Sequence, residues 1–144
     1  MHCRVALITG GSRGIGKGIA IALAEAGCAV VLVSRTNKYK DEIENEFVDL
    51  KLPKPLCLEA DVSDHKSMKL VMSIVQDHFG RLDIVCANAG IFPCAELESL
   101  SSENIDDIFS VNVKGTILTV QAALPMLKKS PAGRVIIPSS ITEP

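Results

Sequence analysis

Short apolar runs alternate along the chain with longer segments in which apolar residues recur at the spacing of a helix. The apolar runs predict strands at about 4–8, 29–33, 56–60, 82–87 and 134–137. The helical spacing predicts helices at about 14–26, 38–51, from Ser63 or Asp64 to 79, and 103–128 with an interruption near Pro125. Because the strands lack an alternation of apolar and polar residues, both of their faces are expected to be buried, as in a parallel sheet.

This order of elements predicts an α/β fold, a doubly wound parallel sheet of the Rossmann type with right-handed crossovers. No change of composition and no internal repeat divides the chain, so residues 1–144 are expected to form one domain. Ligands of such sheets bind at the carboxyl ends of the strands. The residues with distinctive chemistry follow predicted strands, and we therefore expect them to meet at one edge of the sheet.

The turn between the first strand and the first helix is rich in glycine, because residues 9–16 read Thr-Gly-Gly-Ser-Arg-Gly-Ile-Gly. Glycine tolerates positive φ and lets the backbone approach a ligand closely. The helix that follows offers unpaired N–H groups and the positive end of its dipole to an anion. Gly18 is expected to let this helix pack closely on the sheet. A nucleotide pyrophosphate suits such a turn.

Two interpretations of the turn compete. Gly11, Gly16 and Lys17 nearly complete a P-loop, G-x-x-x-x-G-K-[ST]. Gly18 stands where that motif needs the hydroxyl that holds Mg²⁺, so a P-loop nucleotide phosphatase is the weaker alternative. The spacing G-x-G-x-x-G of the common dinucleotide fingerprint does not fit either.

The pattern that does fit is T-G-x-x-x-G-x-G, formed by Thr9, Gly10, Gly14 and Gly16. It resembles the short-chain dehydrogenase/reductase family, and within it the 3-oxoacyl reductases. The resemblance implies a nicotinamide dinucleotide as cofactor, and hydride transfer between its nicotinamide and a small carbonyl/alcohol substrate.

The end of the second predicted strand indicates which dinucleotide is preferred. An acidic residue there would bind the ribose hydroxyls and favour NAD(H). This chain has Ser34 and then Arg35, whose planar guanidinium can pair with a 2′-phosphate. Arg13 in the glycine turn is expected to reach the same phosphate. The sequence therefore predicts NADP(H), with NAD(H) as the weaker alternative.

Further segments carry the resemblance. Asp61, followed by Val62, matches a family residue that binds the adenine amino group. Asn88-Ala89-Gly90 resembles a family segment that lies beside the cofactor ribose. The Asn of that segment can tie neighbouring strands together. Asn112, inside the long helix, resembles a family residue that distorts this helix and holds a water of the proton relay. The resemblance implies cofactor-binding roles for Thr9, Gly10, Ser12, Arg13, Gly14, Ile15, Gly16, Ser34, Arg35, Asp61, Val62, Asn88, Ala89 and Gly90.

Ser140 matches the catalytic serine of the family, although Pro138 departs from the pattern. The family's acid–base Tyr and its Lys, in Y-x-x-x-K, should follow soon after Ser140. The single tyrosine, Tyr39, stands near the second strand and cannot serve. The expectation is an enzyme domain incomplete after its fifth strand and inactive alone, from a protein that forms homo-oligomers. The alternative is a non-catalytic dinucleotide-binding module.

Composition narrows the picture further. The 144 residues carry a net charge of −2 without a basic cluster, which does not suggest nucleic acid as a partner. The apolar runs are too short to span a membrane, and the early first strand leaves no room for a signal peptide. Five cysteines without a C-x-x-C pair are expected to be mostly small core residues in a reducing compartment, and we expect no metal site and a cytoplasmic location.

Overall fold

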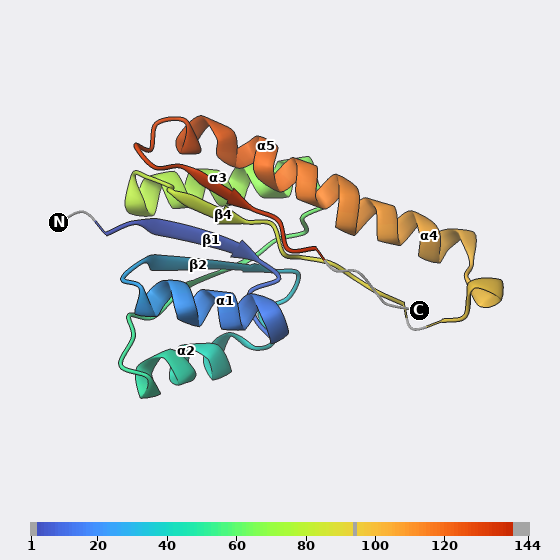
Figure 1. Cartoon of the computed structure of the whole chain (residues 1–144), viewed down its shortest axis with the longest axis horizontal. Coiled ribbons are helices and arrows are strands. Elements are labelled where there is room, and N and C mark those ends of the chain that lie inside the picture. Colours follow the sequence, from blue (N-terminus) through green and yellow to red (C-terminus); the bar gives the residue numbers. More distant parts are fainter. Residues whose placement is uncertain (1–2, 94, 140–144) are drawn as a thin grey trace.

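The computed structural model describes residues 3–93 and 95–139. Five parallel strands form one sheet in the order β3-β2-β1-β4-β5 (Figure 1). The strands are β1 (Val5–Thr9), β2 (Ala29–Ser34), β3 (Leu56–Glu59), β4 (Ile84–Cys86) and β5 (Arg134–Ile136). The helices are α1 (Gly14–Glu25), α2 (Lys40–Asp49), α3 (His65–Phe79), the 3₁₀ turn η1 (Leu97–Ser99), α4 (Ser102–Ile108), the π-helix η2 (Phe109–Gly115) and α5 (Thr116–Leu127). The predicted doubly wound parallel sheet is confirmed.

Helices cover both faces of the sheet. In Figure 1, α1 and α2 lie on one face, and α3 with the long segment α4–η2–α5 lies on the other. Side chains of β1 alternate between two cores: Ala6 and Ile8 pack with residues of α1 and α2, whereas Val5 and Leu7 pack with residues of α3 and α5. All of β1 is buried because it has a strand on each side and helices above and below. The chain turns away from β1 in opposite directions through β2 and β4, which places a crevice between the loops that follow β1 and β4.

The long helix differs from its prediction. The expected interruption near Pro125 is wrong, because α5 continues through this proline to Leu127. Pro125 lacks only the N–H that would bond one turn back, and the buried side chains of Ala123, Met126 and Leu127 keep the last turn packed. The irregularity lies instead around Asn112, where seven residues adopt π-helical hydrogen bonding. The distortion that the family resemblance implied at this asparagine is therefore confirmed.

The remaining helix and strand boundaries shift by a few residues. The strand predicted at 82–87 is limited to Ile84–Cys86, and the helix predicted at 38–51 to Lys40–Asp49. Asp64, not Ser63, caps α3, because its carboxylate accepts hydrogen bonds from the backbone N–H groups of Lys66 and Ser67. Among the described residues, no helix is both long and apolar enough to cross a membrane.

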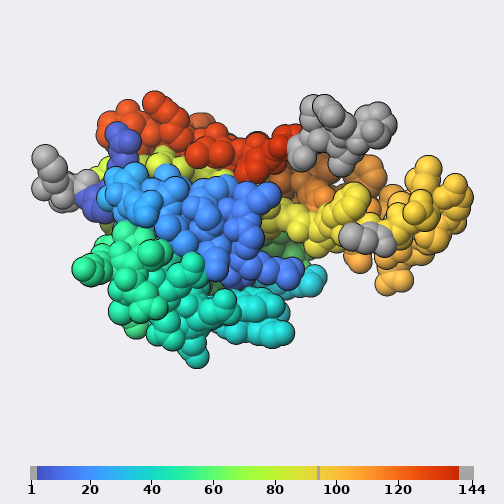
Figure 2. All heavy atoms as spheres, turned by 60° about the horizontal axis from the view of Figure 1, so that its bottom comes forward, coloured from blue at the N-terminus to red at the C-terminus, as the bar shows by residue number. Residues whose placement is uncertain are grey.

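Strand β5 forms an exposed edge of the sheet. It pairs with β4 only, and Val135, Ile136 and Ile137 are 42%, 41% and 55% exposed. Figure 2 shows the face built by α1 and α2, with η1 and the start of α4 projecting at one side. Two apolar side chains of the long segment α4–η2–α5 are also exposed, Phe109 of η2 by 62% and Ile117 of α5 by 60%.

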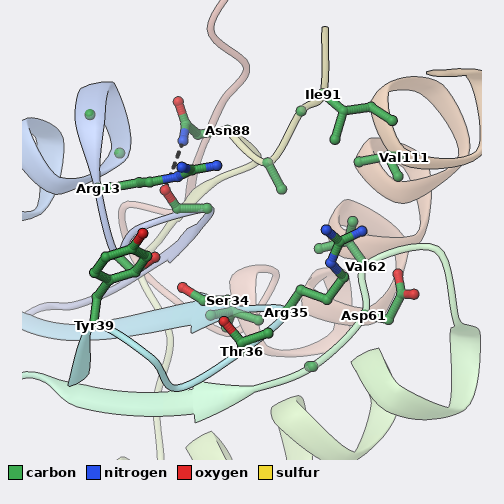
Figure 3. A pocket seen from close by; sticks show the side chains of 18 of the residues that line it. Arg13, Ser34, Arg35, Thr36, Tyr39, Asp61, Val62, Asn88, Ile91 and Val111 are labelled. Carbon is green, nitrogen blue, oxygen red and sulfur yellow. Dashed lines mark hydrogen bonds between the residues drawn. The ribbon is translucent and has the colours of Figure 1, made fainter. Parts of the chain in front are cut away.

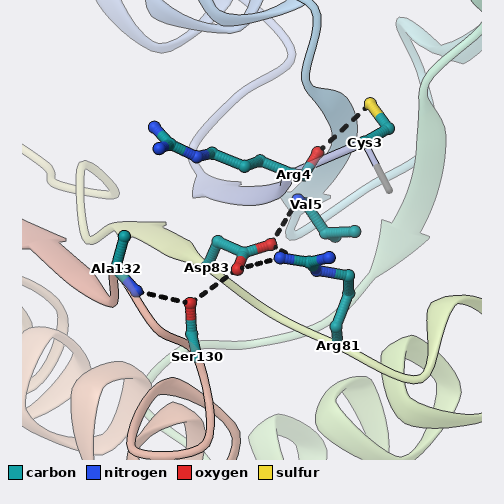
Figure 4. Close-up of polar contacts among 7 residues, drawn as sticks. All are labelled: Cys3, Arg4, Val5, Arg81, Asp83, Ser130 and Ala132. Carbon is teal, nitrogen blue, oxygen red and sulfur yellow. Dashed lines mark hydrogen bonds and ion pairs between the residues drawn. The ribbon is translucent and has the colours of Figure 1, made fainter. Parts of the chain in front are cut away.

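A buried carboxylate ties the amino ends of the strands together (Figure 4). Asp83 is 1% exposed and accepts hydrogen bonds from the Arg81 guanidinium at 2.7 and 2.8 Å. It also accepts from the Ser130 hydroxyl at 2.6 Å and from the Val5 backbone N–H at 2.9 Å. These donors, with Arg81 as the largest contribution, lower the pKa of Asp83 from its ordinary 3.8 to about 2. The carboxylate therefore joins β1, β4 and the turn after α5 at the end of the sheet opposite the crevice.

We expect acid to remove the stability that Asp83 contributes. Because the pKa of Asp83 is lower in the folded than in the unfolded chain, its contribution is complete above about pH 5 and is lost as the pH falls through 3.8 toward 2. The shift corresponds to about 2 kcal/mol of unfolding free energy. Urea unfolding from pH 7 to 2.5 measures it: Asp83→Asn should be less stable at pH 7 and should flatten the decline below pH 4. The exposed Asp77→Asn is the control, and an unchanged decline in Asp83→Asn would contradict the assignment.

Candidate functional site

The crevice at the carboxyl ends of the strands holds a cavity of about 570 Å³ (Figure 3). It is built by the turn after β1, the segment after β2, the end of β3, the loop after β4 and the π-helix η2. Its lining consists of Gly10, Ser12, Arg13, Gly14, Ile15, Gly16, Val33, Ser34, Arg35, Thr36, Lys38, Tyr39, Ala60, Asp61, Val62, Asn88, Ala89, Gly90, Ile91 and Val111. Segments that are distant in the sequence therefore meet where the topology predicts a ligand.

The glycine turn forms the side of the cavity next to α1. Gly14 has φ of +54°, a conformation that side chains with a Cβ seldom adopt, and an added Cβ would meet no protein atom within 4 Å. Gly14 also begins α1, so unpaired N–H groups of the helix N-terminus lie at the cavity. The turn thus combines an open approach to the backbone with the electropositive end of a helix.

Close packing of α1 depends on Gly16, and the prediction for Gly18 is wrong. A Cβ on Gly16 would overlap the carbonyl oxygen of Gly10 and would stand 2.6 Å from Asn88 Nδ2. Gly18 is exposed, and a Cβ there would meet nothing within 4 Å. The two glycines lie on different sides of the helix because residues two apart do not share a face.

Thr9 and Asn88 lock the ends of β1 and β4 together. The Thr9 hydroxyl oxygen accepts hydrogen bonds from the backbone N–H groups of Asn88 and Ala89 at 3.1 and 3.0 Å. Asn88 Nδ2 donates to the carbonyl oxygen of Thr9 at 3.1 Å. The expectation that Asn88 ties neighbouring strands is confirmed. Thr9 is 1% exposed and lies beneath the cavity lining, where it positions the two loops.

Two arginines enter the cavity from different elements. Arg13 extends from the glycine turn and Arg35 from the end of β2, as Figure 3 shows. Arg35 points toward Asp61 and Val62, and Arg13 and Tyr39 both line the cavity. The structure therefore brings both cations to the cavity lining. That Arg13 reaches the same phosphate as Arg35 stays a prediction.

Asp61 contributes a fixed negative charge opposite Arg35. Its Oδ1 accepts hydrogen bonds from the Ser63 hydroxyl at 2.7 Å and from the Ser63 backbone N–H at 2.8 Å. These bonds, assisted by the charges of Arg35 and Lys114, lower the pKa of the carboxyl group. Asp61 thus lies ionised at neutral pH beside Val62, which is 7% exposed and closes the cavity next to it.

Asn112 acts on the cavity through Ile91. Asn112 Oδ1 accepts a hydrogen bond from the Ile91 backbone N–H at 2.8 Å, and its Nδ2 donates to the Ile91 carbonyl oxygen at 2.9 Å. Asn112 does not line the cavity itself, whereas Ile91 and the preceding residue of the π-helix, Val111, do. Its side-chain amide therefore holds the loop after β4 in place. Ser140, the other residue assigned a catalytic role from the sequence, lies outside the described residues.

Several lining residues are absent from the sequence-based site: Val33, Thr36, Lys38, Tyr39, Ala60, Ile91 and Val111. Most of them are next to a predicted site residue in the sequence. They could have been predicted from this adjacency. Tyr39 lies on the side of Arg13, across the cavity from Ile91 and Val111 (Figure 3). Lys38 Nζ stands 5.5 Å from the centre of the Tyr39 ring, within range of a cation–π contact.

Lys17 does not take the position that a P-loop requires. Its Nζ forms an ion pair with Glu46 Oε2 of α2 at 2.7 Å, and this hydrogen bond raises the pKa of Lys17. Lys17 is not among the lining residues of the cavity. The structure therefore argues against the P-loop alternative. Within 3–93 and 95–139, no three His, Cys, Asp or Glu residues form a cluster that could hold a metal ion.

Known proteins resemble the chain in sequence. A family model for short chain dehydrogenases matches residues 4–143. The probable tetrahydroxynaphthalene reductase of Zymoseptoria tritici is 36% identical over 144 residues, which covers 96% of this chain and 51% of that protein.

Solved structures give the same result. A 3-ketoacyl-ACP reductase from Sinorhizobium meliloti 1021 superposes with a TM-score of 0.82 at 38% identity, over 92% of this chain and 52% of its own. A short chain dehydrogenase from Burkholderia cenocepacia J2315, solved in complex with NADP, superposes with a TM-score of 0.83 at 33% identity, over 93% of this chain and 54% of its own. The chain thus spans about half the length of the proteins that it matches. Because the family model covers nearly all of its residues and the fold agrees, this chain belongs to the short-chain dehydrogenase family.

Proposed function

We propose that the chain binds NADP(H) in this cavity and serves an oxidoreductase that transfers hydride between nicotinamide and a carbonyl/alcohol pair. The observation that carries the proposal is the convergence of the glycine turn, Arg35, Asp61 and the Asn88 loop on one cavity at the switch point of the sheet. The oxidoreductase names of the relatives support the reaction class.

The lining residues suit the parts of a dinucleotide. The open backbone at Gly14 and the N-terminus of α1 would hold the pyrophosphate. The carboxylate of Asp61 would accept a hydrogen bond from the adenine amino group, with Val62 against the ring. Asn88, Ala89 and Gly90 would lie along the ribose on the side of the nicotinamide. When bound, the nicotinamide supplies the carbon that gives or takes hydride.

The preference for NADP(H) rests on charge at the end of β2. Ser34 stands where an acid would bind free ribose hydroxyls, and Arg35 adds a cation at the cavity. The nearby carboxylate of Glu59 accepts a hydrogen bond from the Asn37 backbone N–H at 3.1 Å, and Glu59 does not line the cavity. The NADP complex of the Burkholderia relative is consistent with this preference.

Titration calorimetry with NADPH and NADH tests the preference. We expect NADPH to bind roughly tenfold or more tightly than NADH, since a hydrogen bond to a charged group contributes about 1.5–3 kcal/mol. Ser34→Asp combined with Arg35→Ala should reverse the order. Lys17→Ala removes a cation paired outside the cavity and should leave the preference unchanged. Equal affinities of the unmodified chain for both cofactors would contradict the proposal.

A second candidate, binding without catalysis by this chain alone, is favoured by one observation. The sequence has a single tyrosine, Tyr39, and it lies at the N-terminus of α2, across the cavity from Ile91 and Val111. The substrate would lie beside the nicotinamide, next to Asn88, Ala89 and Gly90 and on the side of Ile91 and Val111, away from this phenol. Assembly into homo-oligomers stays a prediction.

A further inference from the structure

We propose that Gly115 is a positioning residue for the cofactor site: it lets the π-helix η2 lie against Val62 and so fixes the cavity wall that receives the adenine ring. This inference rests on the proposed binding of a dinucleotide. Gly115 is not among the lining residues, so it acts on the cavity through Val62 and η2 and not by contact with the ligand.

The backbone of Gly115 does not itself require glycine. Its φ of −60° and ψ of −40° are ordinary helical values that every residue adopts. Glycine weakens a helix in comparison with alanine, so helix propensity does not explain why glycine stands at position 115. The constraint is steric: a Cβ on Gly115 would stand 2.6 Å from Val62 Cγ2 and 3.2 Å from Val62 Cβ.

Val62 cannot move aside freely. It is 7% exposed and belongs to the core between the sheet and α3 and α5. Its branching at Cβ limits it to few side-chain conformations, so rotation of one methyl group brings the other toward its neighbours. A side chain at position 115 would therefore push Val62 into the cavity, or push η2 away from the sheet.

Displacement of η2 would also reach the cavity. Val111 of η2 lines it directly, and Asn112 holds the backbone of Ile91 by two hydrogen bonds of 2.8 and 2.9 Å. Both ways of relieving the overlap therefore shift a wall of the same cavity. Since packed interiors relax by shifts of the whole neighbourhood, we expect Gly115→Ala to weaken NADPH binding by roughly tenfold.

The test is a double-mutant cycle on the whole chain, with NADPH dissociation constants from titration calorimetry. Gly115→Ala should bind roughly tenfold more weakly than the unmodified chain, and Val62→Ala only a few-fold more weakly. Gly115→Ala combined with Val62→Ala should recover most of the loss, because removal of the two Val62 methyl groups makes room for the new one. This double variant also keeps the test valid if Gly115→Ala alone does not fold.

Gly133→Ala is the matched control. A Cβ there would stand 2.6 Å from the Leu127 carbonyl oxygen, an overlap with backbone at the same distance, in the turn before β5 at the opposite end of the sheet. It should lower the melting temperature but leave the NADPH affinity unchanged. The methyl NMR signals of Val62 in the ligand-free chain give a second readout, and they should shift in Gly115→Ala and stay in place in Gly133→Ala.

The outcomes separate this inference from the proposed function. If the unmodified chain fails to bind NADPH, the proposed function is wrong and the inference falls with it. If it binds and Gly115→Ala binds equally well, only the inference is overturned. The same holds if the double variant shows the sum of the two single losses, because the effect would then not pass through Val62.

Discussion

Gly14→Val will abolish measurable NADPH binding while leaving the chain folded. Gly14 lines the cavity with φ of +54°, and the space beside its Cα is open to the ligand. A valine there places a branched side chain at the helix N-terminus where the pyrophosphate would lie, and it adds backbone strain of about 1–2 kcal/mol. We expect the affinity to fall by roughly a hundredfold or more, from loss of about 3 kcal/mol of charge-assisted hydrogen bonding. Titration calorimetry measures the affinity and circular dichroism the fold.

Two further variants separate strain from obstruction of the ligand. Gly80→Val carries a comparable strain, because Gly80 has φ of +67° with nothing within 4 Å of an added Cβ, but it lies at the C-terminus of α3. It should lower stability and leave the affinity unchanged. Gly14→Asn tolerates the positive φ and still brings a side chain to the cavity, so it should bind weakly with little loss of stability. Full NADPH affinity in Gly14→Val would show that the turn does not contact phosphate.

The polypeptide of these 144 residues, purified by itself, will self-associate and show no carbonyl reduction above background. Its only tyrosine, Tyr39, lies across the cavity from Ile91 and Val111, so no positioned tyrosine supplies the proton. The absence of a positioned acid–base group alone lowers the rate by roughly 10²–10⁴-fold. The exposed edge of β5 and the exposed side chains of Phe109 and Ile117 provide surfaces for association.

Light scattering and an NADPH oxidation assay with ketones and 3-oxoacyl thioesters measure both effects. Ile136→Lys adds a charge to the exposed strand β5 and should raise the monomeric fraction without restoring turnover. A monodisperse chain that reduces any of these compounds would show that turnover does not depend on a positioned tyrosine.

The sheet and the position of the cavity could be predicted from the sequence because they depend on local signals. Continuous apolar runs, helical spacing and strand-ending glycines each act over a few residues, and the order of strands and helices then limits the topology. The ends of β1, β2, β3 and β4 meet at one cavity, as the strand-end residues predicted. The ends of helices and strands are predicted less accurately than their existence. The helix predicted at 38–51, for example, spans Lys40–Asp49, because packing decides where a helix stops.

What local patterns could not provide are contacts between distant segments. Asp83 attracts no notice in the sequence, yet it binds donors from β1 and from the turn after α5. Gly16 and Gly18 stand two residues apart in the same helix, and only the approach of Gly10 and Asn88 shows that Gly16 is the one that allows close packing.

The sequence by itself therefore determined the class of fold, the glycine turn at a helix N-terminus and the cationic end of β2. The tertiary structure decided which side chains line the cavity and which ones hold the lining in place, such as Asn112 on Ile91 and Gly115 against Val62. The reason is physical: secondary structure follows from interactions a few residues apart, whereas packing and buried hydrogen bonds depend on groups that meet only after the chain has folded.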